Sequence, residues 1–490
     1  MPSAQVVLTA LLAASPAPDF ATSEAGNPFV RGRYADPDTQ HYNGEYWVFP
    51  TSSLPYDQQT YLDAFSSPDL VHWTKHANVL DAHDFSWAHR AVWAPAPVER
   101  NGTYYLYFAA NDIQEAEDNA VGGIGVGVAD RPEGPYRDPL GRPLIGAYHN
   151  GAQPIDQDVF VDDDGQAYIY YGGHSHANVA RLNADMISLG TFEDGSTFRE
   201  ITPEHYVEGP QMLKHRDVYY LFWSEGGWGG PDYAVAYAMA SSPVGPFERV
   251  GRILQQDAAV ATGSGHNAVI HVPDTDIYYM LYHRHPLGAT DQNDRHLAYD
   301  RLRFNEDGTI QPVGMLVRDG FQDGQMFNWE VYGGAWDAQS CSLHADSDPG
   351  GKALLNTNFS DFIYEADITI PHTRDDTNAG LIFRVTEPHV GPDAYRGYYA
   401  GIDVSSRGLV IGRADAGGWT WLGGVSVDAR PGNKVHLTVK ARGDLISVSV
   451  DDVTANVRDR TYASGQNGVR VYNTEAVFDN IDIRHFTEQA

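Results

Sequence analysis

Cysteine is almost missing from this sequence: Cys341 is the one example in 490 residues. No disulfide can form within the chain, so its stability has to come from buried cores. Basic residues are scarce too, with 33 lysines and arginines against 65 acidic residues and a net charge of −32. Such a surface repels phosphate backbones and anionic lipids, so we expect neither nucleic acid nor a membrane as a partner.

Long apolar runs are also absent from the start of the chain. Residues 6–14 are apolar, but this run is too short to span a membrane, and no lysine or arginine precedes it. Ser15-Pro16-Ala17 follows it. We interpret residues 1–26 as a signal peptide or a disordered N-terminus, and we expect a secreted, extracellular protein that is a monomer.

Long helical periodicity is missing, whereas 49 glycines and 29 tyrosines indicate an all-β protein. One pattern occurs five times: a turn with Asn, Asp or Gly leads into a tyrosine-rich strand. The copies cover residues 43–49, 101–107, 164–170, 216–222 and 274–280. Their spacing of about 50 to 65 residues suits four strands with variable loops, which is one propeller blade. The sequence therefore predicts a five-bladed β-propeller over residues 27–318.

A short segment precedes each tyrosine-rich strand by ten to twelve residues, about the length of one strand and its turn. The first strand of each propeller blade lines the central channel, so equivalent positions converge on the axis. The residues that we expect there are Asp36, Trp93, Asp156, Glu208 and His266. A single carboxylate would most simply be a solvated loop residue. Three at one place repel each other and destabilise the fold unless they are paired or used.

This set of side chains fits the hydrolysis of glycosidic bonds. That reaction needs one carboxylic acid to protonate the leaving oxygen and one carboxylate as base or nucleophile. A nearby carboxylate can keep the acid protonated near neutral pH. The face of Trp93 can stack on the apolar side of a sugar ring.

Three motifs carry a resemblance to a known family: Asp36-Pro37, Ile155-Asp156 with Val159-Phe160 beyond it, and Val207-Glu208-Gly209-Pro210. In this order and on five repeats they resemble glycoside hydrolase family 43. The resemblance implies an inverting enzyme in which Asp36 is the general base, Glu208 the general acid, and Asp156 the modulator of the acid's pKa. Asp158 competes with Asp156 for that last role, and we prefer Asp156 because its spacing to Val159-Phe160 matches.

The same resemblance implies further site residues. His266 matches an axial histidine that, in many relatives, lies near a calcium ion. Because calcium prefers oxygen ligands, a structural histidine is an equally open interpretation. Arg295 is the candidate for an arginine of the pocket, and Tyr34, Trp93 and Trp223 are further candidates for binding substrate. No organic cofactor is expected.

The resemblance also implies a substrate class. We expect an enzyme that releases pentose units from plant polysaccharide, as an α-L-arabinofuranosidase acting on arabinoxylan or arabinan, with β-xylosidase as the alternative. A retaining fructosidase similar to family 32 is another class, but its usual Asn-Asp-Pro-Asn start is replaced by residues 34–38. A lectin-like propeller without catalysis would have no need of three axial acids.

The C-terminal part has its own β pattern. Residues 319–335 are rich in glycine and aspartate and are interpreted as a linker. Residues 336–490 alternate apolar and polar positions, which predicts a concanavalin-like jelly-roll β-sandwich. It is similar to carbohydrate-binding module family 66. The domain either binds carbohydrate or only supports the propeller, and the candidates for binding are Trp419, Trp421, Tyr398 and Tyr399.

Overall fold

The computed structural model describes residues 25–115, 121–372 and 377–486. The predicted signal peptide therefore lies outside the described residues, except for its last two positions. Within the described ranges, no helix is long and apolar enough to cross a membrane. The described residues form an all-β structure, as predicted, and they include short 3₁₀ turns at η2 (Tyr56–Gln58) and η3 (Ala82–Asp84).

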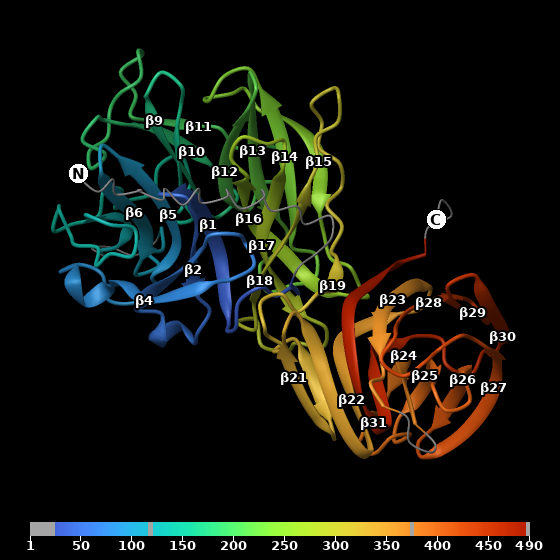
Figure 1. Cartoon of the computed structure of the whole chain (residues 1–490). Coiled ribbons are helices and arrows are strands. Elements are labelled where there is room, and N and C mark those ends of the chain that lie inside the picture. The colour runs from blue at the N-terminus through green and yellow to red at the C-terminus, as the bar shows by residue number, and fades with distance from the viewer. Residues whose placement is uncertain (1–24, 116–120, 373–376, 487–490) are drawn as a thin grey trace, which may run out of the picture.

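Five antiparallel sheets form the blades of a propeller (Figure 1). Blade I contains β1 (Tyr34–Tyr42), β2 (Glu45–Ser52), β3 (Tyr61–Ser67) and β4 (Thr74–Asp81), and blade II contains β5 (Trp93–Arg100), β6 (Thr103–Ala110) and β7 (Gly123–Ala129). Blade III contains β8 (Asp158–Val161), β9 (Ala167–Tyr171), β10 (Asn178–Leu182) and β11 (Phe198–Glu200). Blade IV contains β12 (Glu208–His215), β13 (Val218–Glu225), β14 (Ala234–Ala240) and β15 (Glu248–Leu254), and blade V contains β16 (Ala261–His271), β17 (Tyr278–Pro286) and β18 (His296–Leu302). Each of the five tyrosine-rich copies forms the second strand of its blade.

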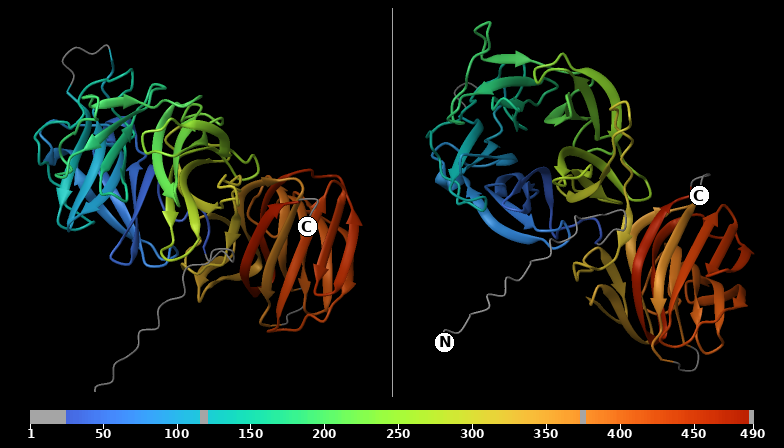
Figure 2. Two further views of the ribbon diagram at one scale, coloured as in Figure 1. Left: turned by 90° about the horizontal axis from the view of Figure 1, so that it is seen from above. Right: turned by 45° about the horizontal axis from the view of Figure 1, so that its top comes forward.

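The five first strands form a closed ring. Strands β1, β5, β8, β12 and β16 each contact the next one, and β16 contacts β1 again (Figure 2). The N-terminal segment helps to close this ring, because the Asn27 side chain pairs with the backbone of Tyr299: its Nδ2 donates to the carbonyl at 2.9 Å and its Oδ1 accepts from the amide at 3.2 Å. Residues that begin each blade are therefore brought to a common axis.

The second domain is a β-sandwich built around two long strands, β22 (Ser342–Phe359) and β31 (Gly465–His485), which pair with each other. The other strands are β19 (Val317–Asp319), β20 (Trp329–Tyr332), β21 (Ala335–Gln339), β23 (Phe362–Thr369), β24 (Asn378–Thr386), β25 (Arg396–Asp403), β26 (Gly408–Asp415), β27 (Gly418–Ser426), β28 (Lys434–Arg442), β29 (Leu445–Val450) and β30 (Val453–Arg458).

The predicted linker over residues 319–335 is not a free tether, which corrects that expectation. Strand β19 pairs with β31, and β20 pairs with β22, so this segment belongs to the sandwich. One hydrophobic cluster runs from blades IV and V into the sandwich and includes Leu254, Met280 and Phe359. The glycines and aspartates of the segment indicated turns, but the pairing depends on β22 and β31, which lie far along the chain.

Candidate active site

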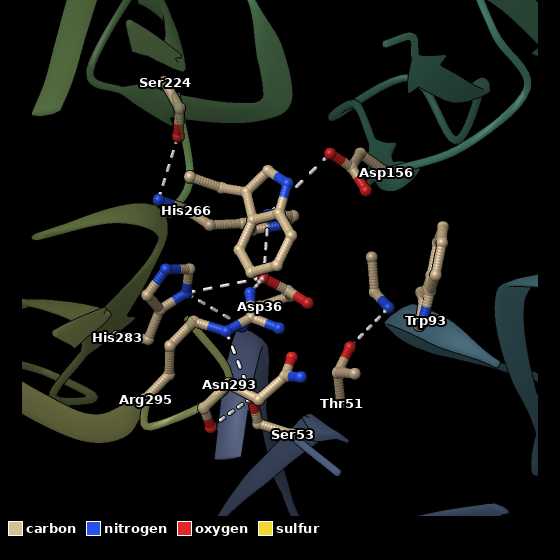
Figure 3. A network of polar contacts seen from close by, with 12 residues as sticks. Asp36, Thr51, Ser53, Trp93, Asp156, Ser224, His266, His283, Asn293 and Arg295 are labelled. Atoms are coloured by element: carbon tan, nitrogen blue, oxygen red, sulfur yellow. Dashed lines mark hydrogen bonds and ion pairs between the residues drawn. The ribbon is translucent and has the colours of Figure 1, made fainter. Parts of the chain in front are cut away.

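One pocket on the propeller axis collects most of the predicted site residues. Asp36, Asp156, Glu208 and His266 line a cavity of about 370 Å³, together with Trp93 and Arg295. Figure 3 shows Asp36, Trp93, Asp156, His266 and Arg295 reaching this region from different blades. The pocket thus brings together all five residues that the repeat pattern placed on the axis.

In two blades, the residue that the sequence pattern placed on the axis lies one position before the structurally equivalent residue. Each blade has a residue with left-handed backbone at a corresponding place, within its first strand or just before it. These residues are Asp36 (φ 47°), Ala94 (φ 45°), Asp156 (φ 56°), Gly209 (φ 64°) and His266 (φ 47°). Trp93 and Glu208 therefore precede the repeated position instead of occupying it. The sequence signal was the proline that follows at Pro37, Pro95 and Pro210.

This left-handed residue explains how the pocket is built. The ladder shifts register beside it in β1, β5, β12 and β16, as at a β-bulge. A bulge turns side chains away from the regular alternation of a strand. A non-glycine residue in this conformation is strained by about 1 kcal/mol or more, and such strain is concentrated at functional sites.

Three basic side chains surround the carboxylate of Asp36. Its Oδ1 lies 3.0 Å from Nη1 of Arg295 and 3.4 Å from Nδ1 of both His266 and His283. Burial alone would raise its pKa, but the charge of Arg295 first, and the charges that His266 and His283 carry when they are protonated, hold the pKa of Asp36 well below its usual range. Asp36 is therefore ionised at neutral pH, as a base must be.

His283 contributes as a neutral ring. The backbone N–H of Asp36 donates to Nδ1 of His283 at 3.2 Å, so the proton of this imidazole sits on Nε2. Burial lowers the pKa of His283 to about 3. The pKa of His266 is also lowered, first by burial. Of the cationic groups around Asp36, only Arg295 thus carries a full charge at neutral pH.

Arg295 is fixed on both sides of its guanidinium. Its Nε donates to Oγ of Ser53 at 3.1 Å, and Oγ of Ser53 donates to the carbonyl of Asn293 at 2.9 Å. The guanidinium carbon lies 4.8 Å from the ring centroid of Trp228, a cation–π contact. The predicted pocket arginine is therefore anchored and buried, with 7% of its side chain exposed.

Glu208 has the properties of a proton donor. Burial first, and then the charge of Asp36, raise the pKa of Glu208 to about 7. The hydroxyl of Tyr233 donates to Oε1 of Glu208 at 2.9 Å, which works against that rise by stabilising the ionised form. A carboxyl group that is about half protonated at neutral pH can give its proton to a leaving oxygen.

Asp156 is the buried neighbour of this acid. Burial raises the pKa of Asp156 well above its usual value, and the charges of Glu208 and Asp36 raise it further. Asp156 and Glu208 therefore titrate as a pair that holds at least one proton at neutral pH. Oδ2 of Asp156 also lies 3.9 Å from Nδ1 of His266.

The structure separates Asp156 from its competitor Asp158. Oδ2 of Asp158 accepts from the backbone N–H of Met212 at 2.7 Å. Asp158 lines another cavity, shared with Asp38, rather than the pocket that contains Glu208. Position alone thus favours Asp156 as the residue that influences Glu208.

Of the four predicted substrate-binding residues, two line the pocket and two do not. Trp93 and Arg295 are at its wall. Tyr34 is buried, with its hydroxyl donating to Asp63 at 2.8 Å, and Trp223 is 0% exposed within the core. Neither Tyr34 nor Trp223 can contact a sugar in the pocket, because alternation along their strands turns both side chains into the packing between blades.

The repeat pattern missed several residues that lie behind or around the acids. Tyr233 was not among the predicted site residues, although it is the hydrogen-bond donor to Glu208. Its ring lies over Gly265, where a Cβ would be 2.3 Å from Cδ1 of Tyr233. The glycine before His266 was therefore a signal for a close ring. Asp112 and Gln153 also line the pocket and are joined by a hydrogen bond of 2.9 Å.

Calcium was predicted near His266, and its fit can be tested on the donor atoms present. Within the described ranges, no group of three or more His, Cys, Asp or Glu side chains is placed to hold a metal. Two buried amide oxygens, Oε1 of Gln157 and Oδ1 of Asn267, have no hydrogen-bond partner there. They directly follow the left-handed residues of blades III and V, and oxygen is the donor that calcium prefers. The described residues therefore offer these two amide oxygens as candidate calcium ligands, without forming a complete metal site.

Comparison with known proteins decides the family. The family model for glycosyl hydrolases family 43 matches residues 25–310. The chain belongs to this family. A second model, for a 3-keto-alpha-glucoside-1,2-lyase-like domain, matches residues 318–484. The likeness of the sandwich to module family 66 stays a prediction.

Three relatives illustrate the range of family 43. A β-D-galactofuranosidase of Aspergillus niger is 44% identical over 310 residues, covering 60% of this chain and 86% of that protein. An arabinoxylan arabinofuranohydrolase of Bacillus subtilis is 30% identical over 57% of this chain and 62% of its own length. A crystal structure of a β-xylosidase/α-arabinofuranosidase from a compost metagenome, with xylotriose and in a calcium-free form, is 25% identical with a TM-score of 0.50, covering 59% of this chain and 97% of that one.

This family 43 protein is a glycoside hydrolase, and its substrates are oligosaccharides or polysaccharides. Membership in family 43 argues against the alternative of a lectin-like propeller without catalysis. It also argues against the family 32 fructosidase, because the matching model covers the whole propeller.

Proposed function

We propose that the enzyme is an α-L-arabinofuranosidase that removes terminal arabinofuranosyl units from arabinoxylan or arabinan by inversion. One observation carries this proposal: the axial pocket holds an ionised carboxylate, Asp36, and a carboxyl group with a pKa of about 7, Glu208. Hydrolysis of a glycosidic bond needs this division between a carboxylate and a protonated acid. The resemblance to family 43 implies inversion, and the arabinofuranohydrolase named among the relatives supports the choice of sugar.

In this proposal each pocket residue has one task. Asp36 removes a proton from the attacking water, and Arg295 keeps Asp36 ionised and oriented. Glu208 gives its proton to the leaving oxygen, and Asp156 helps to keep that proton in place. Trp93 offers a ring face to the sugar, as aromatic side chains do at sites for amphipathic ligands.

A second candidate substrate is a β-D-galactofuranoside. The relative that shares 44% identity has this activity in its name. The ring of β-D-galactofuranose has the stereochemistry of α-L-arabinofuranose and carries one more hydroxymethyl group, so one catalytic arrangement suits both sugars. β-Xylosidase activity is the third alternative.

The test is a comparison of kcat/KM on the nitrophenyl glycosides of α-L-arabinofuranose, β-D-galactofuranose and β-D-xylopyranose. We expect the arabinofuranoside to be cleaved best. A higher value on the galactofuranoside would replace the first candidate by the second, and cleavage of the xyloside alone would leave the third. No cleavage of any of them would contradict the proposed function.

Two accessory features are proposed with it. We infer that a calcium ion binds on the axis beside His266, held by Oδ1 of Asn267 and Oε1 of Gln157. We also infer that the sandwich holds polysaccharide through Trp419 and Trp421, which are 40% and 65% exposed and lie on one face of β27. Tyr398 and Tyr399 were candidates too, but both are buried and cannot contact a polymer. Secretion, which would bring the enzyme to such polymers, is part of the same proposal.

A further inference from the structure

A second cavity lies where the propeller meets the sandwich. Its volume is about 430 Å³, at least that of the axial pocket, and within the range of small-molecule sites. Its walls come from the segment before β1, from blade V and from β22 of the sandwich, where the N–H of Asn358 donates to the carbonyl of Ala259 at 2.9 Å. None of the residues in the proposed reaction lines it.

Two segments of blade V contribute side chains to both the second cavity and the active site. In β17, His283 contacts Asp36, and the next residue, Arg284, lines the second cavity. Just before β18, Arg295 contacts Asp36, and the first residue of β18, His296, lines the second cavity. Successive side chains of a strand point to opposite faces, so the two sites lie back to back.

The charge of the lining is unusual for this protein. Three arginines and one histidine line the cavity, and no aspartate or glutamate does, although the chain has a net charge of −32. Arg33 and His296 are paired with acids of the 291–294 loop. The exposed guanidinium of Arg31 forms no ion pair within the described residues. Arg31 is therefore the cation of the lining that is left to attract an anion.

Arg284 gives this cavity a buried donor. It is 7% exposed, and its Nη2 donates to the carbonyl of Asn27 at 3.0 Å. Its Nη1 is buried without a hydrogen-bond partner in the described part of the chain. Asp300, a buried acid whose charge interacts with Arg284, does not line the cavity. A guanidinium in such a place suits a carboxylate, which accepts two N–H bonds in one plane.

The remaining lining suits a sugar ring rather than a simple anion. Nδ2 of Asn328 donates to the carbonyl of Pro28 at 3.0 Å, and Nδ2 of Asn356 donates to the carbonyl of Leu287 at 3.1 Å. The amide oxygens of both side chains can then accept from hydroxyl groups of a ligand. Apolar side chains complete the walls; they include Val30, Val260, Phe327 and Leu355. A pyranose ring with a carboxylate presents an anion, hydroxyl groups and an apolar C–H face together.

We propose that this cavity binds a uronic acid unit, with its carboxylate toward Arg31 and Arg284 and its hydroxyl groups toward Asn328 and Asn356. The unit is either a free uronate or an acidic branch of the polysaccharide on which the enzyme acts. This inference goes beyond the proposed function and holds whichever pentose or hexose the active site removes.

The experiment is titration calorimetry of the full chain with D-glucuronate and, as the neutral match, D-glucose. We expect saturable binding of glucuronate, weaker at high salt, and no comparable binding of glucose. Arg31→Glu and Leu355→Trp, which reverse a charge and fill the cavity, should each weaken binding about tenfold or more. Arg216→Glu, at an exposed turn of blade IV, is the matched control and should bind as the wild type does.

Several results would overturn the proposal. They are absence of glucuronate binding by the folded wild type, equal binding of glucose, and unchanged binding in both cavity variants. Loss of binding when arabinose saturates the axial pocket would also overturn it, because the ligand would then be in the active site. Comparison of a neutral arabinoxylan with a uronate-substituted one identifies the source: tighter binding of the substituted polymer indicates a branch, and binding of glucuronate alone indicates the free acid. No step requires turnover, so failure here is distinct from failure of the proposed function.

Discussion

Nη1 of Arg295 lies 3.0 Å from Oδ1 of Asp36, although 259 residues separate the two in the chain. The ion pair joins the first strand of blade I to the start of the last strand of blade V, where the propeller closes. It also supplies the charge that keeps a buried aspartate ionised. Closure of the fold and ionisation of the proposed base therefore depend on the same contact.

Arg295→Gln should move the acid limb of the pH profile. Removal of the positive charge raises the pKa of Asp36, so more of the base is protonated at a given low pH, and the fall of kcat/KM with acid should begin at a higher pH. The rate at neutral pH should fall about tenfold or more. Arg295→Lys, which keeps the charge, should shift the limb less. An acid limb that stays at its wild-type position in the glutamine variant would contradict this account of Asp36.

Tyr233→Phe should move the opposite limb. The tyrosine hydroxyl stabilises the ionised form of Glu208, so its loss raises the pKa of Glu208 above about 7. Because the acid must be protonated, activity should persist to higher pH, by on the order of one unit. Tyr206→Phe is the matched control, since the hydroxyl of Tyr206 donates to the carbonyl of Gly172 instead. A basic limb that moves to lower pH, or equally in both variants, would be evidence against this role.

The repeat pattern could predict the propeller because each blade carries its own signal, a turn followed by a tyrosine-rich strand. It could also predict Asp36, Asp156 and His266, because symmetry brings equivalent positions to one axis, and it placed Glu208 within one residue of that position. It could not predict Tyr233 or His283, which reach the pocket from other strands through contacts such as the ring of Tyr233 over Gly265. Tyr34 was misassigned because a motif gives the position of a residue and not the face of the strand on which its side chain lies.

Removal of calcium should lower stability. If a calcium ion satisfies Oδ1 of Asn267 and Oε1 of Gln157, exhaustive chelation should lower the Tm by about 5 °C, and added calcium should restore it. Asn267→Ala should make the Tm insensitive to chelation. Differential scanning calorimetry in chelator, calcium and magnesium is the measurement. An unchanged Tm in the wild type would mean that His266 and its neighbours are only structural.

Trp421→Ala should weaken attachment to polymer. Trp421 is the most exposed aromatic side chain of β27, and loss of a stacking platform should reduce the fraction bound to insoluble arabinoxylan severalfold. The measurement is the protein left in solution after the polymer is sedimented, with the Tm as a check of folding. Val453→Ala, at another exposed apolar position of the sandwich, is the control. Equal retention of both variants and the wild type would assign the sandwich a supporting role only.

The division of labour between Asp36 and Glu208 is the central claim, and leaving-group dependence tests it most directly. The measurement is kcat of Asp36→Ala and Glu208→Ala on a nitrophenyl arabinofuranoside and on arabinoxylan. A base is needed for every substrate, so Asp36→Ala should lose about 10³-fold or more on both. An acid matters less when the leaving group departs easily, so Glu208→Ala should lose far less on the nitrophenyl glycoside than on the polymer. Equal losses of the two variants on both substrates, or full activity of either one, would contradict the assignment.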